Sequence, residues 1–206
     1  EKQMLHALIA EAIVHDGAAA NDEAEIIAYH FKYAGKNKDA FTYFLRAAER
    51  KRSLYALHET ITLLREACAL LPAEEIENTV FENLAECYSL AGDYKNAVQL
   101  YEQLRSGSHE DIQRYRYAKE LALIYNREGR LEEAIALLLE ASTFAQTVEE
   151  KIDIEEELII IDISRGRYTE AFERSQHALQ VHSDLSNSVT MTAVLNNLGI
   201  IHFYQN

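Results

Sequence analysis

Gly92-Asp93-Tyr94-Lys95-Asn96-Ala97 is the first of three related stretches, and it recurs as Gly129-Arg130-Leu131-Glu132-Glu133-Ala134 and as Gly166-Arg167-Tyr168-Thr169-Glu170-Ala171. The alanines that end these stretches follow one another at intervals of 37 residues. A fixed period of this length is typical of stacked two-helix repeats. The recurrence therefore predicts an all-α fold, a right-handed superhelical solenoid of antiparallel helix pairs.

Apolar and small residues on both sides of Gly92 have helical spacing. They fall mostly three or four residues apart, at Phe81, Leu84, Ala85 and Tyr88 before the glycine and at Ala97, Tyr101 and Leu104 after it. A glycine that directly follows a helix takes the left-handed backbone conformation without a side-chain clash, so the second helix folds back antiparallel to the first. The small side chains of Ala85 and Ala97 then allow the two backbones to approach closely.

The same spacing along the rest of the chain predicts further helices. The expected ranges are 3–15, 21–34, 38–51, 54–70, 75–91, 94–105, 111–128, 131–144, 148–165, 168–182 and 188–204. Only 7 Gly and 1 Pro are present to interrupt them, and no linker divides them.

This pattern resembles the tetratricopeptide repeat (TPR), which has a large residue at position 4, Leu at 7, Gly or Ala at 8, Tyr at 11, Ala at 20, an aromatic residue at 24 and Ala at 27. The second copy supplies Ala118, Leu121, Ala122, Tyr125, Ala134, Leu138 and Ala141 at these positions. The third copy departs from the pattern at Glu155, Asp162 and Ser175, so the pattern defines its packing least well. The period of 37 exceeds the usual ~34, which indicates helices about one turn longer.

The resemblance extends upstream in a weaker form. Ala28, Phe31, Gly35, Ala40, Phe44 and Ala47 fit positions 8, 11, 15, 20, 24 and 27, and Leu64, Ala67 and Pro72 fit positions 24, 27 and 32 of an overlapping unit. We therefore expect a single helical repeat domain over residues 1–206. It comprises degenerate TPR-like helices in 1–72, three TPR-like repeats of about 37 residues in 73–183, and the first helix of a truncated repeat in 184–206.

The first 70 residues carry a second resemblance. The stretches Leu5-His6-Ala7-Leu8-Ile9-Ala10-Glu11-Ala12-Ile13, Ile26-Ile27-Ala28-Tyr29-His30-Phe31 and Phe44-Leu45-Arg46-Ala47-Ala48-Glu49-Arg50 are similar to the helical region that follows the nucleotide-binding and winged-helix domains in bacterial STAND-class signalling ATPases and transcriptional activators. In that family the repeats sense an effector or partner and restrain the ATPase. The chain starts without an initiator Met and stops inside an apolar helical pattern, so we expect a fragment of a longer protein.

The charge and cysteine content limit the partners and the compartment. With 34 acidic and 20 basic side chains, the formal net charge is -14, which opposes binding to nucleic acids and to anionic membranes. Neither a membrane-spanning apolar run nor a signal segment is present in the sequence. Cys68 and Cys87 lack the spacing of metal ligands and read as buried thiols. These features predict a cytoplasmic protein without direct nucleic-acid or membrane contact.

The sequence contains no pattern typical of a catalytic, cofactor or metal site. A phosphate-binding loop ending in Gly-Lys-Ser/Thr is missing, and the 8 His form no His-Glu-x-x-His pair. The acidic run Glu155-Glu156-Glu157 reads as a solvated helix face rather than an acid–base pair. The basic cluster of Arg46, Arg50, Lys51 and Arg52 reads as a solvated helix end that complements the helix dipole. We therefore expect no enzymatic activity and no cofactor.

A concave groove is the best candidate for a binding site. In the TPR family, positions 2, 5, 9, 12 and 13 of each first helix line the inner surface, and the resemblance implies a partner-binding groove here. Its residues are Glu82, Glu86, Arg116, Lys119, Leu123, Asn126, Arg127, Asp153, Glu156, Ile160, Asn196 and Ile200. Arg116, Lys119 and Arg127 are suited to a carboxylate, and Asn126 and Asn196 to peptide amides. The alternative is that these groups pair with each other.

The repeat register also predicts a ladder of opposite charges along this groove. Side chains 37 residues apart should face each other across neighbouring first helices, which puts Lys119 between Glu82 and Glu156 and sets Arg116 opposite Asp153.

These observations predict a scaffold that binds a protein or peptide. The second resemblance implies that it is the sensor or regulatory domain of a larger bacterial signalling ATPase or transcriptional regulator, with other domains of the same chain as further partners. One alternative is a small-molecule sensor, which a compact pocket closed by Tyr29, Tyr33 and Phe203 would favour. Another is a structural module for self-association.

Overall fold

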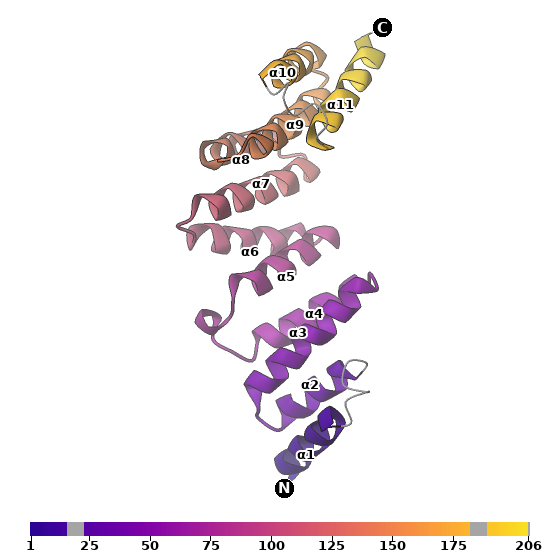
Figure 1. Ribbon diagram of the computed structural model, residues 1–206, viewed down its shortest axis with the longest axis vertical. Helices are drawn as coiled ribbons and strands as arrows, with labels where there is room; N and C mark the ends of the chain where they lie inside the picture. The colour runs from indigo at the N-terminus through magenta and orange to yellow at the C-terminus, as the bar shows by residue number, and fades with distance from the viewer. Residues whose placement is uncertain (16–22, 182–188, 206) are drawn as a thin grey trace. The chain divides into compact units, whose positions relative to one another are not determined.

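The computed structural model describes residues 1–15, 23–181 and 189–205, and every regular element in these ranges is helical. The all-α class and the packing of helices in sequential pairs, both predicted from the repeated glycine stretches, are confirmed (Figure 1). The chain forms two compact units, Glu1–Leu100 and Tyr101–Asn206.

The first unit begins with four helices and continues through a short 3-10 turn. Its elements are α1 (Lys2–His15), α2 (Ala24–Tyr33), α3 (Asn37–Ser53), α4 (Leu57–Cys68), η1 (Ala73–Glu75), α5 (Asn78–Leu90) and the start of α6 (Tyr94–Ser106). Contacts join α1 to α2, α2 to α3, α3 to α4, and α4 to α5. The helix α3 therefore packs against α2, which precedes it in the chain, and against α4, which follows it.

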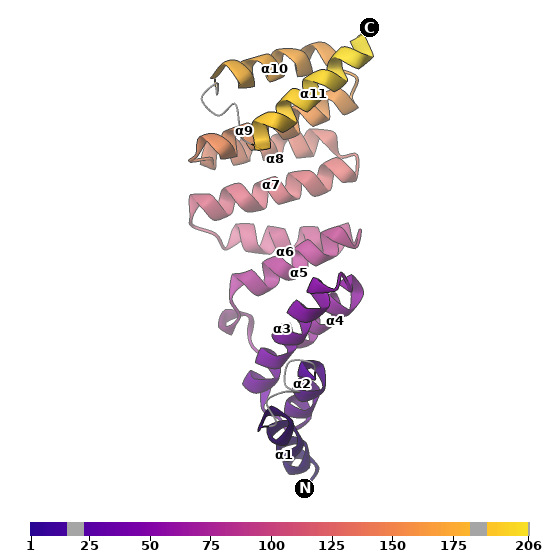
Figure 2. The same ribbon diagram turned by 45° about the vertical axis from the view of Figure 1, so that its right-hand side comes forward.

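The second unit contains the end of α6 and five more helices. These are α7 (Asp111–Arg127), α8 (Leu131–Phe144), α9 (Val148–Ser164), α10 (Tyr168–Val181) and α11 (Val189–Gln205). The helices α7 and α8 form one pair and α9 and α10 the next, while α11 packs on both α9 and α10 (Figure 2). In addition, α7 contacts α9 and α9 contacts α11, so the first helices of successive pairs adjoin one another.

Each predicted glycine turn has the same backbone geometry. The φ angles are 76° at Gly35, 77° at Gly92, 76° at Gly129 and 70° at Gly166. The residue after each glycine donates its N–H to the carbonyl five residues earlier, as in Arg130 to Tyr125 at 2.8 Å. This is the Schellman ending of a helix, and it satisfies carbonyl groups that the helix end leaves unpaired.

A turn of the same kind joins α3 to α4, with Tyr55 in the position that glycine holds elsewhere. Tyr55 has φ of 57°, and the N–H of Ala56 bonds the carbonyl of Lys51 at 3.0 Å. This turn was not predicted from the sequence: the next helix was expected to begin at residue 54, whereas α4 begins at Leu57. A residue other than glycine in the left-handed region costs about 1–2 kcal/mol, so glycine is expected at such a turn. Because tyrosine stands here instead, the sequence gives no sign of the turn.

The predicted small residues lie at close helix contacts. Ala97, Ala134 and Ala171 have no exposed surface, and Ala85 and Ala122 are at most 1% exposed. Large apolar side chains fill the remaining space, as close packing of helices requires. In the second unit, one such cluster joins Ile152 and Ile159 of α9 to Val194 and Ile201 of α11.

The three departures of the third copy have a common explanation in the α9–α10 pair. Arg174 of α10 donates to Asp162 at 3.3 Å and to Glu155 at 3.2 Å. The hydroxyl of Ser175, which is fully buried, donates to the carbonyl of Ala171 at 2.7 Å. The polar residues that break the apolar pattern are thus paired inside the unit, as buried polar groups must be.

Other predicted boundaries agree with the structure to within a few residues. The largest shifts, of three residues, come at the starts of α2, α4 and α5; α5 begins at Asn78 rather than 75 because η1 occupies the preceding residues. The predicted boundary between residues 183 and 184 lies outside the described residues. No helix within the described ranges is long and apolar enough to cross a membrane.

Candidate functional site

Ten of the predicted groove residues lie on the three adjoining helices α7, α9 and α11. They are Arg116, Lys119, Leu123, Asn126 and Arg127 on α7, Asp153, Glu156 and Ile160 on α9, and Asn196 and Ile200 on α11. All ten side chains are half-buried or exposed, so this face of the second unit is open to a partner. Glu82 and Glu86 belong to α5 of the first unit and are half-buried.

An ion pair connects α7 to α9 on this face. Lys119 Nζ lies 2.6 Å from Asp153 Oδ2, and the two side chains are 21% and 35% exposed. The predicted ladder placed Lys119 beside Glu156 and Arg116 opposite Asp153. Lys119 does act on the Glu156 carboxylate, whose pKa it acts to lower, but its short ion pair is with Asp153, one helical turn earlier on α9 than expected. A long side chain leans toward the start of its own helix, and Lys119 therefore reaches the turn before the expected one.

The first unit shows the same offset between α3 and α5. Arg52 Nη2 lies 2.6 Å from Glu86 Oε2, and these residues, like Lys119 and Asp153, are 34 positions apart. In both pairs the acid lies 34 residues after the cation, which is three residues fewer than the repeat period of 37. At the α7–α9 junction the predicted pairing of opposite charges is therefore present, with the ion pair displaced by one turn.

The three consecutive glutamates of α9 divide between two sides of the helix: Glu155 faces α10, and Glu156 and Glu157 lie near Lys119 of α7. Glu155 pairs with Arg174, as described above. Burial raises the pKa of Glu157 to about 6 against the opposing effect of Lys119, and burial together with Asp153 raises the pKa of Glu156. Because consecutive residues on a helix are rotated by about 100°, one acidic run serves both sides of α9. The prediction of one solvated acidic face was therefore wrong for Glu157.

Tyr115 anchors the start of α9 against α7. Its ring is 6% exposed, and its hydroxyl donates to the carbonyl of Glu150 at 3.5 Å. Burial and the nearby Asp153 carboxylate raise the pKa of Tyr115, so the hydroxyl stays protonated and remains a donor. A capping box fixes the first turn of α9: Glu150 N–H bonds Thr147 Oγ1 at 3.1 Å, and Thr147 N–H bonds Glu150 Oε2 at 3.0 Å.

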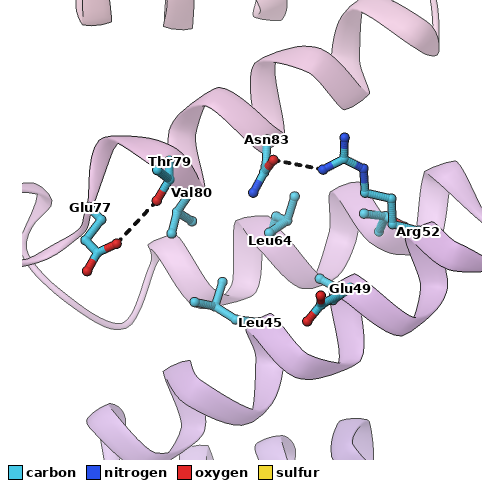
Figure 3. A pocket seen from close by; sticks show the side chains of 10 residues that line it. Leu45, Glu49, Arg52, Leu64, Glu77, Thr79, Val80 and Asn83 are labelled. Carbon is cyan, nitrogen blue, oxygen red and sulfur yellow. Dashed lines mark hydrogen bonds between the residues drawn. The ribbon is translucent and has the colours of Figure 1, made fainter.

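The first unit contains a pocket of about 310 Å³ between α3, α4 and α5 (Figure 3). Its apolar part is formed by Leu45, Ala48, Leu64 and Val80, and its polar part by Glu49, Arg52, Thr60, Glu77, Thr79 and Asn83. Arg52 Nη1 donates to Asn83 Oδ1 at 2.8 Å, which links α3 to α5 across the pocket. Arg52 is exposed, as predicted, and in addition its guanidinium holds two α5 side chains, Asn83 and Glu86.

This pocket was not predicted from the sequence, because the turn at Tyr55 was not recognised. If Tyr55 is aligned with Gly92, α3 becomes the first helix of a repeat, and Leu45, Glu49 and Arg52 take positions 5, 9 and 12. Those are positions that the resemblance assigns to the groove. The spacing of these residues thus fits the repeat, but the tyrosine at the position of the turn glycine prevented the repeat from being recognised.

Other chemistry has little support among the described residues. No group of three or more His, Cys, Asp or Glu side chains in these ranges is placed to hold a metal ion. Tyr33 and Phe203 are 58% and 78% exposed, so neither closes a pocket around a small molecule. His6 and His30 meet through their Nδ1 atoms at 2.9 Å and join α1 to α2.

Comparisons with known proteins agree on the repeat fold. Residues 80–110 match the tetratricopeptide repeat family. No curated protein matches the chain.

Several solved structures resemble it at low sequence identity. BtubC from P. vanneervenii has a TM-score of 0.63 at 18% identity, with 94% of this chain and 83% of that chain covered. A putative kinesin light chain with TPR-like repeats from Podosopora anserina has 0.60 at 17%, covering 91% and 99%. YrrB, described as a TPR protein with an unusual peptide-binding site, has 0.50 at 16%, covering 79% and 76%. These likenesses show a TPR-like fold.

Proposed function

We propose that this chain is a scaffold that binds a peptide or protein segment along the exposed faces of its first helices. The observation that carries the proposal is the pair of half-buried carboxylates Glu156 and Glu157 beside Lys119 on the α7–α9 face. Charged groups that are partly desolvated on an open surface are frequent at functional sites, because a ligand can complete their interactions. The accessible Leu123 and Ile160 add apolar contact on the same face.

The mixture of groups on this face fits a peptide better than a small ligand. Arg116 and Arg127 are exposed cations, Asn126 carries both a donor and an acceptor, and the apolar residues lie between them. A peptide presents backbone amides and alternating side chains to such a surface. The peptide-binding site named for YrrB is consistent with this use of the fold.

A wider assignment is that the chain is the sensor or regulatory part of a longer bacterial signalling ATPase or transcriptional regulator. It rests on the resemblance of the first 70 residues to STAND-class proteins. The partner would then include other domains of the same chain, and the protein would be cytoplasmic. Sequencing the complete gene tests this, because a phosphate-binding loop upstream supports the assignment and its absence from the full chain contradicts it.

Selection of binding peptides from a random displayed library tests the scaffold proposal. Selected peptides should lose at least about fivefold in affinity for Arg116→Ala and for Asn126→Ala, since each change removes a polar contact of about 1 kcal/mol. Arg167→Ala is the matched control, because Arg167 is exposed in the turn before α10. Equal affinity for all three variants would contradict binding on this face.

The same purified protein can be used to distinguish self-association from peptide binding. A structural module of this kind would yield no selected peptide and would show a concentration-dependent mass in analytical ultracentrifugation. A monomer with saturable peptide binding supports the scaffold.

A further inference from the structure

We propose that the pocket between α3 and α5 is a specificity site for a partner segment in which an apolar side chain is followed by Lys or Arg. This deepens the proposed function and rests on it, because it names the chemistry of the peptide that the first unit selects.

The apolar part of the pocket accommodates one side chain of the partner. Ala48, Leu64 and Val80 are 2%, 5% and 7% exposed and form its base, with Leu45 at one side. The volume of about 310 Å³ lies at the lower end of the ~300–1,000 Å³ range of ligand pockets. An aliphatic side chain that enters this space removes apolar surface from water on both partners.

The charges at the edge favour a cation. Figure 3 shows Glu49 beside Leu45 on one side of the pocket and Glu77 at its far end. Arg52 is the basic residue of the lining, and its charge is compensated by the contact with Glu86 at 2.6 Å. Two carboxylates with one compensated guanidinium leave the edge negative, which attracts Lys or Arg and repels an acidic segment.

The orientation of Asn83 adds a donor for the partner's backbone. A guanidinium can only donate hydrogen bonds, so the atom of Asn83 that faces Arg52 at 2.8 Å must be the amide oxygen. The amide nitrogen consequently points away from Arg52 and toward the pocket (Figure 3). It can donate to a peptide carbonyl between the apolar and the cationic side chain, which gives the bound segment a direction.

Three capped synthetic peptides test the proposal by two-dimensional NMR on the 15N-labelled chain. The probes are acetyl-Gly-Ser-Leu-Lys-Ser-Gly-amide and its two variants, one with Glu in place of Lys and one with Ser in place of Leu. The Leu-Lys probe should shift the Asn83 side-chain amide and the Val80 backbone amide, and it should bind at least about fivefold more tightly than either variant.

Charge reversal at Glu49 should change the preferred probe from Leu-Lys to Leu-Glu. Glu49→Lys should bind the Leu-Glu probe more tightly than the Leu-Lys probe, whereas the control Glu173→Lys, at an exposed position of α10, should keep the original order. Glu49→Gln should bring the two affinities together. These substitutions are at exposed positions, so unchanged spectra elsewhere in the chain verify folding.

The outcomes separate this proposal from the broader one. Equal binding of the Leu-Lys and Leu-Glu probes, or shifts confined to α7 and α9, overturns the pocket assignment and leaves the scaffold proposal intact. No shift from any probe also overturns the pocket assignment. The scaffold proposal falls only if the library selection described above yields no peptide.

Discussion

The guanidinium of Arg174 binds the carboxylate of Asp162, with Nε 3.3 Å from Oδ2, at a position where two other copies of the repeat carry tyrosine. The acid is 9% exposed and the arginine 34%, so the pair is partly shielded from water. Glu155 shares the same arginine. Arg174 of α10 thus neutralises Asp162 and Glu155 of α9, two acids at positions where the repeat pattern has other residues, so that both can be accommodated in the packed pair.

Removing the arginine should destabilise the second unit. Arg174→Leu leaves Asp162 without its cation in a buried position, and we expect a loss of about 1–3 kcal/mol, below the value for fully buried pairs because Arg174 is partly solvated. Urea unfolding followed by circular dichroism measures the effect. Arg167→Leu is the control at an exposed arginine, and adding Asp162→Asn to Arg174→Leu should recover part of the loss. An unchanged midpoint for Arg174→Leu would contradict the role given to this pair.

The Tyr55 turn should be improved by glycine. Tyr55→Gly relieves the left-handed strain of about 1–2 kcal/mol and adds flexibility to the unfolded chain, so we expect a net gain of about 0.5–1 kcal/mol. Tyr55 is 94% exposed, so little packing is lost. The reciprocal change, Gly129→Ala, should destabilise by about 1 kcal/mol, because a Cβ there meets no atom within 4 Å and only the backbone strain counts. Urea midpoints that move in the same direction for both variants would refute the shared turn geometry.

Ala134 should not tolerate a larger side chain. It has no exposed surface in the α7–α8 pair, so Ala134→Leu is expected to destabilise by about 1–3 kcal/mol through overpacking. Ala136 is an exposed alanine of the same helix, and Ala136→Leu should change stability by less than about 0.5 kcal/mol. Chemical unfolding of both variants provides the comparison.

The acidity of Glu157 should appear in the pH dependence of stability. Its folded pKa of about 6 lies above the ordinary value of 4.5, so its contribution to stability is most favourable below pH 4.5 and declines as the pH rises toward 6. Glu157→Gln removes this decline. It should stabilise the chain by about 1 kcal/mol at pH 8 and have little effect at pH 4.

Unfolding curves measured between pH 4 and pH 8 check this sign. Glu173→Gln, a change at an exposed glutamate of α10, should give the same small effect at every pH. A Glu157→Gln difference that does not vary with pH, or that grows toward low pH, would show that the carboxyl is not desolvated.

The sequence predicts features that depend on backbone conformation and side-chain size more fully than features that depend on side-chain reach. The glycines at 92, 129 and 166 and the alanines that follow them determine the turns and the close contacts, because few residue types satisfy those requirements. The turn at Tyr55 was missed since a strained residue gives no such signal. The partner of Lys119 was placed one turn too far because a repeat register locates backbones, whereas the flexible ammonium extends beyond its own position.

For the candidate site, too, the positions of the residues were easier to predict than the surroundings of their side chains. The predicted face of α7, α9 and α11 followed from the repeat register together with the resemblance to the TPR family, and its ten residues are half-buried or exposed. The desolvation of Glu157 and the pocket beside Glu49 depend on how neighbouring helices cover those side chains. No local pattern in one helix encodes such coverage.

The offset of the Lys119–Asp153 pair has a consequence for how such a chain can be duplicated. A side chain at position 5 of one repeat meets position 2 of the next, and the second copy carries Lys119 and Arg116 at these positions while the third carries Glu156 and Asp153. A tandem array of identical second copies would therefore set Lys against Arg at every junction, and identical third copies would set Glu against Asp. Identical copies adjoin favourably at this junction only if positions 5 and 2 of the same copy carry opposite charges, so the α7–α9 ion pair depends on the sequence difference between the second and third copies.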